Sequence, residues 1–310
     1  MSKQTKPKYE VCVITEKTKE DPIFKFISKL KFFLNGIGHQ YGNDMQNTCD
    51  YRISSDFELI FVEGGQNQIE IDGVIHNGNP GDIFVIPPFS KNKIQTTKEN
   101  PHDNYWIHFS MDPFCYNEVF LNLLLTERGN YCIKSESFQS CIMLLKRIEE
   151  EMNEMQPGYK VIREGYFRTI LALLIRENIK KSDTITFPSV SKAQRRNLEL
   201  IMKYVDEHLN QSITVQDIAE HVHLSVSYIF RIFQDNINCS PNRYIRVQKA
   251  MMAKIYMETS QMTLYEISKE LGFLNYSYFS KLFKDIYGVS PKGFIDRHPI
   301  VQNNCNGKEE

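Results

Sequence analysis

Two stretches, SYIFRIFQDNINCSP at residues 227–241 and SYFSKLFKDIYGVSP at residues 277–291, repeat nearly the same pattern fifty residues apart. Each begins with Ser-Tyr, carries apolar residues at helical spacing and ends in Ser-Pro. A Ser-Pro pair is typical of a helix start, because serine caps the helix and proline fits its first position. The repeat therefore predicts two copies of one helical unit.

A short amphipathic segment precedes each copy and predicts a further helix. Thr214 stands three residues before Asp217, and Thr263 three before Glu266, which is the spacing of a capping box. Three- or four-residue turns, 223–225 and 272–275, follow these segments. Helix, short turn and helix is the helix-turn-helix arrangement, whose second helix enters the major groove of DNA. A repeated helix pair is also compatible with an all-helical interaction domain.

The second helix of each pair is predicted to bury an apolar face and to turn a polar face outward. We expect the buried face to hold Tyr228, Ile232 and Phe233 in the first copy and Tyr278, Leu282 and Phe283 in the second. The outward face would meet base edges and phosphates. The candidate DNA contacts are Ser227, Phe230, Arg231, Gln234, Tyr276, Ser277, Ser280, Lys281 and Lys284.

The segment between the copies, PNRYIRVQKAMMAKIYMET at 241–259, predicts one continuous helix. Such a helix can hold the two units at a fixed separation. Reading successive major grooves on one face of the duplex needs about 34 Å.

The N-terminal part of the chain has a β pattern between residues 56 and 109. FELIFVEGG, QIEIDGVIH, NPGDIFVIPP and NYWIHFSM alternate or run apolar between turns, and Asp72-Gly73 is a strong hairpin signal. Regular short strands predict an antiparallel barrel or sandwich. Two helical segments follow, 138–152 and 164–177, separated by Pro157-Gly158. Their apolar faces suit either a dimer contact or packing on the barrel.

The whole chain thus reads as an α+β protein of two domains. We place the strand domain with its helical hairpin at 1–180, a polar linker at 181–192, the helical domain at 193–298 and a flexible tail at 299–310.

Composition narrows the class of protein. The 310 residues carry a formal net charge of −1, and the C-terminal third is slightly basic. We find no signal peptide and no apolar run of the roughly 18 residues that span a bilayer. The seven cysteines are scattered, without a CxxC pair, and predict reduced thiols. These features favour a cytoplasmic protein.

The second copy, GFLNYSYFSKLFKDIYGVSP, resembles the signature of the AraC/XylS family of bacterial transcription regulators, over about residues 195–297. The order FELIFVEGG, IEIDG, GDIFVIPP, YWIHF resembles the family's cupin-type sensor barrel, followed by its dimerisation hairpin. The resemblance implies double-stranded DNA, RNA polymerase and a small-molecule effector as partners. It also implies a homodimer, usually acting as an activator.

The first copy departs from the family pattern at several positions. His223 stands in place of the turn glycine, where it can adopt the left-handed conformation at modest cost. Phe230 and Gln234 replace polar and lysine residues, and Asn238-Cys239 replaces a glycine-containing turn. We expect the second copy to keep the family's usual contacts. The first copy should give this protein its own preference, through Arg231 and apolar contact of Phe230 with a thymine methyl.

The barrel lacks the histidine pattern of metal-binding cupins. Asn92 stands where the metal-binding histidine of such enzymes lies, and Phe89 replaces a glycine. No His-x-His occurs upstream, and the histidines at 39, 76, 102 and 108 lack ligand spacing. We therefore expect no metal, no cofactor and no catalysis, although a cupin enzyme with a helical interaction domain is the alternative class.

A small-molecule sensor, with a sugar as one candidate, is the preferred hypothesis for the barrel. A tryptophan face suits sugar stacking, and Trp106 is the only tryptophan. A ligand-independent regulator whose barrel only dimerises stays open, as does Trp106 as plain core. The candidate ligand contacts are Trp106, Glu63, Tyr41, Ile94 and Arg52.

Overall fold

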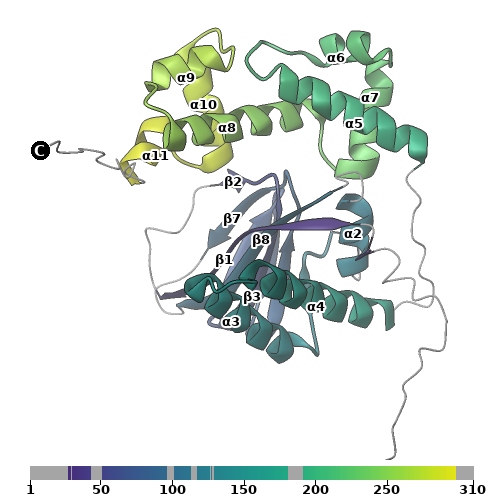
Figure 1. Ribbon diagram of the computed structural model, residues 1–310, viewed down its shortest axis with the longest axis vertical. Helices are drawn as coiled ribbons and strands as arrows, with labels where there is room; N and C mark the ends of the chain where they lie inside the picture. Colours follow the sequence, from purple (N-terminus) through teal and green to yellow (C-terminus); the bar gives the residue numbers. More distant parts are fainter. Residues whose placement is uncertain are drawn as a thin grey trace, which may run out of the picture.

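The computed structural model describes residues 27–28, 30–42, 51–95, 101–112, 117–125, 127, 129–180 and 191–297. Figure 1 shows two parts: a strand-rich part with two long helices along one side, and a helical part stacked on its end. Residues 181–190 of the expected linker, the expected tail and the N-terminal residues 1–26 lie outside the described residues.

The strand-rich part contains two antiparallel sheets, as the α+β assignment predicts. One sheet has the order β1-β8-β3-β6-β9, and the other has the order β2-β7-β4-β5. The strands are β1 (Lys31–Gly42), β2 (Arg52–Ile53), β3 (Phe57–Gly64), β4 (Asn67–Ile71), β5 (Val74–Gly78), β6 (Asp82–Ile86), β7 (Lys91–Gln95), β8 (His102–Asp112) and β9 (Cys132–Lys134).

The alternating sequence sends one set of side chains between the two sheets. Ile60 and Val62 of β3 meet Ile69 and Ile71 of β4 in an interior core. The hairpin between β4 and β5 turns at Asp72 (φ 46°) and Gly73 (φ 86°), the two positive φ angles that a type I′ turn requires. The expected strands are thus confirmed, whereas β1, β2, β7 and β9 were not predicted.

The opposite face of the five-stranded sheet is covered by helices α2 (Asn117–Leu124), α3 (Phe138–Glu154) and α4 (Tyr159–Lys180). The apolar stripes of α3 and α4, including Leu145 and Phe167, are buried in one cluster with the sheet residues Phe61 and Phe109. Of the two alternatives for the hairpin faces, packing on the sheet is therefore the one that the structure shows.

The helical part consists of seven helices among the described residues. They are α5 (Lys192–Glu207), α6 (Val215–Val222), α7 (Val226–Ile237), α8 (Pro241–Thr259), α9 (Leu264–Glu270), α10 (Tyr276–Tyr287) and α11 (Pro291–Arg297). Both expected capping boxes are present, Thr214 with Asp217 and Thr263 with Glu266. The predicted continuous helix between the repeats is α8.

The two helix-turn-helix turns share one geometry at their start and differ in length. A left-handed residue opens each turn: His223 with φ 55°, directly after α6, and Gly272 with φ 66°, two residues after the end of α9. The next amide, of Leu224 or Phe273, donates to a carbonyl five residues back. A Cβ on Gly272 would lie 2.6 Å from the carbonyl carbon of Gln211, so glycine is required there for space as well as for φ.

Lys249 of α8 joins the two helix-turn-helix units from within the core. Its side chain is buried, and its Nζ donates to the carbonyl oxygens of Gln211 and Leu271, each at 2.6 Å. Gln211 precedes α6 of the first unit, and Leu271 ends α9 of the second. Burial lowers the pKa of Lys249 to about 8. The carbonyl oxygens of Gln211 and Leu271 oppose this effect of burial, because they accept hydrogen bonds from the charged ammonium form.

The strand-rich and helical parts touch directly. Arg243 of α8 forms an ion pair with Asp72 of the β4–β5 turn, at 3.1 Å. Ile53 of β2 packs against the helical core. Among the described residues, no helix is long and apolar enough to cross a membrane.

We predict that Lys249→Met destabilises the helical part by about 1–3 kcal/mol, because two carbonyls lose their shared donor. Lys254→Met on the same helix is the control. The Lys254 side chain is 43% exposed in a pair with Glu258, so its loss should cost at most about 0.5 kcal/mol. Urea unfolding followed by far-ultraviolet circular dichroism measures both, and equal midpoints would contradict the role of Lys249.

Candidate nucleic-acid interface and effector pocket

Helices α7 and α10 each start at a capped N-terminus. The Ser225 side chain accepts from the Tyr228 amide, and Asn275 accepts from the Tyr278 amide. Both helices bury a stripe at helical spacing, which includes Ile229 and Phe233 in α7 and Phe279 and Phe283 in α10. The capped ends and buried stripes fix which side chains face outward.

The candidate DNA contacts lie on these outward faces. Exposed positions are Ser227, Phe230, Arg231, Gln234, Ser277, Lys281 and Lys284, and half-buried positions are Tyr276 and Ser280. Neither Lys281 nor Lys284 forms an ion pair with another residue that the structure describes. Both ammonium groups are thus available to a phosphate or a base edge.

The inward placement of Tyr278 was wrong. Its side chain is 52% exposed, and Phe279 occupies the buried position instead. A helix turns 100° per residue, so the stripe through Phe279, Leu282, Phe283 and Ile286 leaves Tyr278 at its edge. Tyr278 thereby joins the outward face of α10, where its ring can contact DNA.

Local contacts orient the outward face of α7. The Arg231 guanidinium lies over the Tyr228 ring, 5.1 Å from its centroid. The Gln234 amide donates to Asn238 at 2.8 Å. Tyr228 is half-buried and accepts from Asn197 of α5. Asn197 thus holds the Tyr228 ring in place, and the ring in turn supports the Arg231 guanidinium.

Trp106 lies between the two sheets, against the glycines of β1. An added Cβ would come within 2.4 Å of the indole at Gly38 and within 3.3 Å at Gly36, so both positions need glycine to accommodate the ring. Ile94 of β7 packs into the same interior core. Of the five candidate ligand contacts, Trp106 and Ile94 point inward as expected, and Arg52 lies in the charged cluster beside them.

A charged cluster lies beside Trp106 on the same side of the sheet. The Arg52 Nη2 donates to both Glu58 oxygens, at 2.7 and 2.8 Å. The His108 Nε2 lies 3.3 Å from Glu58, and its Nδ1 lies 3.1 Å from Asp56. Burial alone would raise the pKa of Glu58, but Arg52 and His108 hold it at about 2.

The charge state of His108 follows from the same neighbours. Burial alone would lower its pKa, but the carboxylates of Glu58 and Asp56 raise it to about 9. His108 is therefore an imidazolium at neutral pH. It stands next to Trp106, with ring centroids 5.5 Å apart in a T-shaped arrangement.

Asn92 completes this cluster and leaves one donor unused. Its Oδ1 accepts from the Arg52 Nε at 3.1 Å. Its Nδ2 is buried and has no hydrogen-bond partner among the described residues. A buried amide without a partner is costly, and a bound polar ligand can satisfy it. Asn92 stands where cupin enzymes carry a metal-binding histidine, and it thus offers a hydrogen-bond donor in place of a metal ligand.

The inward placement of Glu63 and Tyr41 was wrong. Tyr41 is 73% exposed at the end of β1. Glu63 follows the inward Val62, at a bulge before Gly64, and its carboxylate pairs with Lys146 of α3 at 3.5 Å. Both side chains therefore lie outside the space between the sheets.

Sequence reasoning missed Glu58, His108, Asn92 and the two glycines of β1 as neighbours of Trp106 or members of the adjacent charged cluster. Strand alternation could have found the first two. Glu58 shares its face with Ile60, and His108 shares its face with Trp106. Gly36 and Gly38 gave no such signal in the sequence, because the Trp106 ring that they accommodate lies on β8, almost seventy residues away.

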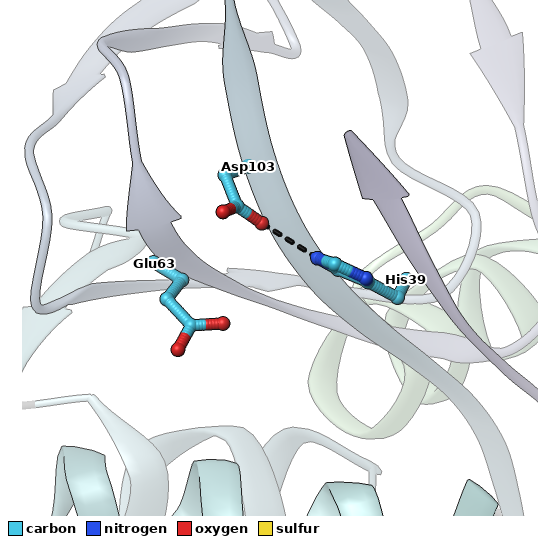
Figure 2. Close-up of side chains that lie close together, drawn as sticks. All are labelled: His39, Glu63 and Asp103. Atoms are coloured by element: carbon cyan, nitrogen blue, oxygen red, sulfur yellow. Dashed lines mark hydrogen bonds and ion pairs between the residues drawn. The ribbon is translucent and has the colours of Figure 1, made fainter. Parts of the chain in front are cut away.

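A second group of titratable side chains lies on the helix-covered side of the sheet (Figure 2). His39, Glu63 and Asp103 place three possible ligand atoms within 4.8 Å of one another. The His39 Nε2 already lies 2.6 Å from Asp103, and Lys146 neutralises Glu63. We interpret this group as polar contacts that join β1, β3 and β8 to α3, because His39 is already bonded to Asp103 and Lys146 is paired with Glu63.

Comparison with known proteins identifies both parts of the chain. Residues 35–153 match the AraC-like ligand binding domain, and residues 218–297 match a helix-turn-helix domain. The chain is 25% identical over 256 residues to the Msm operon regulatory protein of Streptococcus mutans, covering 81% of this chain and 87% of that protein. It is 24% identical over 236 residues to the arabinose operon regulatory protein of Escherichia coli, covering 74% and 77%.

A solved structure of ToxT from Vibrio cholerae shares the fold. Its TM-score is 0.54 at 13% identity, and the match covers 86% of this chain and 98% of that one. The paired arrangement of a two-sheet domain and a double helix-turn-helix domain is therefore found in a solved protein.

We predict that His108→Gln destabilises the strand-rich part by about 1–3 kcal/mol at pH 6. The stabilisation from His108 is complete below its unfolded-state pKa of roughly 6.5. It is lost as pH rises through about 9. The difference between variant and wild type should therefore shrink by pH 10. Urea unfolding followed by Trp106 fluorescence reports on this domain.

His76→Gln is the control for this experiment. Burial lowers the pKa of His76, so its charge does not change between pH 7 and 10. Its effect on stability should be flat over that range. A difference for His108→Gln that stays constant from pH 6 to pH 10 would contradict the charged cluster.

Proposed function

Because the chain belongs to the AraC/XylS family of bacterial transcription regulators, we propose that α7 and α10 read two successive major grooves of one operator. The family establishes a DNA-binding regulator that responds to a small molecule. The assignment of the reading residues is ours, and it rests on the outward faces of the two capped helices.

The two helices offer different chemistry to DNA. On α10, Lys281 and Lys284 lie one turn apart with Ser277, a polar and basic face that suits bases and phosphates. On α7, Arg231 stands beside the exposed ring of Phe230. An arginine suits guanine, and an apolar ring suits a thymine methyl. We therefore assign the protein's own sequence preference to α7.

Arg231→Ala and Lys281→Ala should each weaken binding to the specific site by about 1–3 kcal/mol. Both variants should bind unrelated DNA nearly as the wild type does. Gel shifts with a fragment selected by the full chain from random DNA measure the change. If both variants bind the selected fragment like wild type, the reading assignment is wrong.

Lys284→Ala serves as the contrast in the same assay. A phosphate contact carries no sequence information, so its loss should weaken binding to all fragments alike and reduce the salt slope by about one. A loss confined to the selected fragment would move Lys284 into the group of base-reading residues.

We further propose that a sugar or a similarly hydroxylated small molecule binds between the sheets. Arg52, Glu58 and the free amide of Asn92 supply donors and acceptors beside the Trp106 ring. Aromatic faces with a few fixed polar groups are typical of sugar and small-ligand sites. Among the relatives, names such as lactose operon transcription activator of Staphylococcus xylosus refer to sugar operons.

Trp106 fluorescence should report this binding. Titration with candidate sugars should change the emission for the matching one, and Asn92→Ala should weaken that sugar's affinity by about 1–3 kcal/mol through its lost hydrogen bond. Glu63→Ala, outside the pocket, should leave the affinity unchanged. A sugar that alters DNA binding without perturbing Trp106 would place the effector elsewhere.

The remaining proposed partners are a second copy of the chain and RNA polymerase. Apolar side chains are exposed on the α3–α4 hairpin and suit contact with a second copy of the chain; they are Met143, Met155, Val161 and Ile162. We propose a cytoplasmic homodimer that acts as an activator through RNA polymerase.

A further inference from the structure

Phe89 is a strained residue in the turn between β6 and β7. Its φ is 62°, a left-handed value that favours glycine. Its amide donates to the Ser54 carbonyl at 2.6 Å, and the following Ser90 donates its amide and hydroxyl to Pro87. A bulky residue persists in such a conformation only where its surroundings fix it. The side chain of Phe89 must therefore make contacts that hold this conformation.

The Phe89 ring is buried in the core of the other domain. Only 1% of the residue is exposed, and it belongs to the cluster that α5 to α11 form. Its ring lies 5.5 Å from the ring of Tyr244 on α8. Tyr244 in turn lies 5.5 Å from Phe233 of α7, in a T-shaped arrangement. Three rings thus connect the sensor turn to the helix that we assign to DNA reading.

The same turn leads directly to the proposed effector pocket. Asn92 follows Phe89 by three residues, at the second position of β7, and it is paired with Arg52. On the other side, Arg243 next to Tyr244 is tied to Asp72. Phe89 at one end of the three-ring contact thus lies three residues from Asn92, and α8, which carries the middle ring, is itself paired with the sensor domain.

The outward face of α7 stays free in this arrangement. Arg231 and Gln234 are exposed while the domains are in contact, and the buried Phe233 points to Tyr244. Contact with the sensor domain is thus compatible with DNA reading by α7.

We propose that Phe89 is a positioning residue that sets the orientation of α7, and hence the reading of the first half-site, from the sensor domain. The inference rests on the proposed reading role of α7. It assigns a purpose to a phenylalanine at a backbone conformation that would otherwise favour glycine.

The test compares two DNA fragments with the full-length protein. One is a fragment selected by the wild-type chain from random DNA, and the other has the half-site protected by α7 scrambled. Phe89→Gly removes the ring and relieves the strained φ. We expect it to weaken binding to the intact fragment about tenfold. It should change binding to the scrambled fragment less than twofold, because α7 contributes nothing there.

Two variants control for size and strain. Phe89→Leu keeps an apolar side chain at this position and should lose no more than about threefold on the intact fragment. Phe89→Ala removes the ring but keeps a side chain at the positive φ, so it should weaken binding to the intact fragment as Phe89→Gly does. Thermal unfolding of each variant confirms that both domains remain folded.

The outcomes separate the inference from its premise when Arg231→Ala is run in parallel. Loss with Arg231→Ala but not with Phe89→Gly overturns the positioning role alone. Equal loss by Phe89→Gly on both fragments also overturns it, because the effect is then on the whole domain. A gain in affinity overturns it as well, since the ring would then hold α7 away from DNA. No loss with either variant overturns both the reading assignment and the inference.

Discussion

The double helix-turn-helix arrangement depends on one buried ammonium. Lys249 bonds a carbonyl at the entrance of the first unit and a carbonyl at the turn of the second. Helix α8 alone would fix the distance between its own ends, but not how each unit is rotated about it. A charged donor with two backbone acceptors constrains both units relative to one helix, at the cost of desolvating the charge. Both units are thereby held against α8.

The sensor domain also contains buried charges, but these pair with one another, whereas Lys249 bonds to backbone carbonyls. Arg52 and His108 balance the charges of Glu58 and Asp56, while the Asn92 Nδ2 has no hydrogen-bond partner among the described residues. Charged side chains that bond to one another in this way keep polar groups at fixed positions in an apolar interior. The network holds polar groups beside Trp106, and the unpaired Asn92 donor is the feature on which we base the proposed effector site.

Local patterns were enough to predict the helical domain. Caps, helical spacing and the Ser-Pro starts all act over a few residues, so α6 to α10 and their outward faces follow from the sequence alone. The sequence allowed a left-handed His223 in place of the turn glycine, and its φ is 55°. Tyr278 was misplaced because a residue at the edge of a stripe is decided by its neighbours in space rather than by spacing.

The pocket was harder to predict, for a physical reason. Its members come from β1, β2, β3, β7 and β8, and they meet only when strands distant in sequence pair. Trp106 and Ile94 could be placed by alternation, whereas a bulge at Gly64 ended that alternation next to Glu63. Phe89 illustrates the same limit: its replacement of a family glycine is visible in the sequence, but its burial in another domain is not.

Gly272 has a consequence for the DNA rather than for the protein. Its missing side chain lets the backbone around Gln211 approach the turn of the second unit closely. The space between the two units at this point is therefore too small for a side chain. Natural sites for this protein should accordingly keep a constant number of base pairs between their two halves, because an inserted pair would demand a stretch that this contact does not allow.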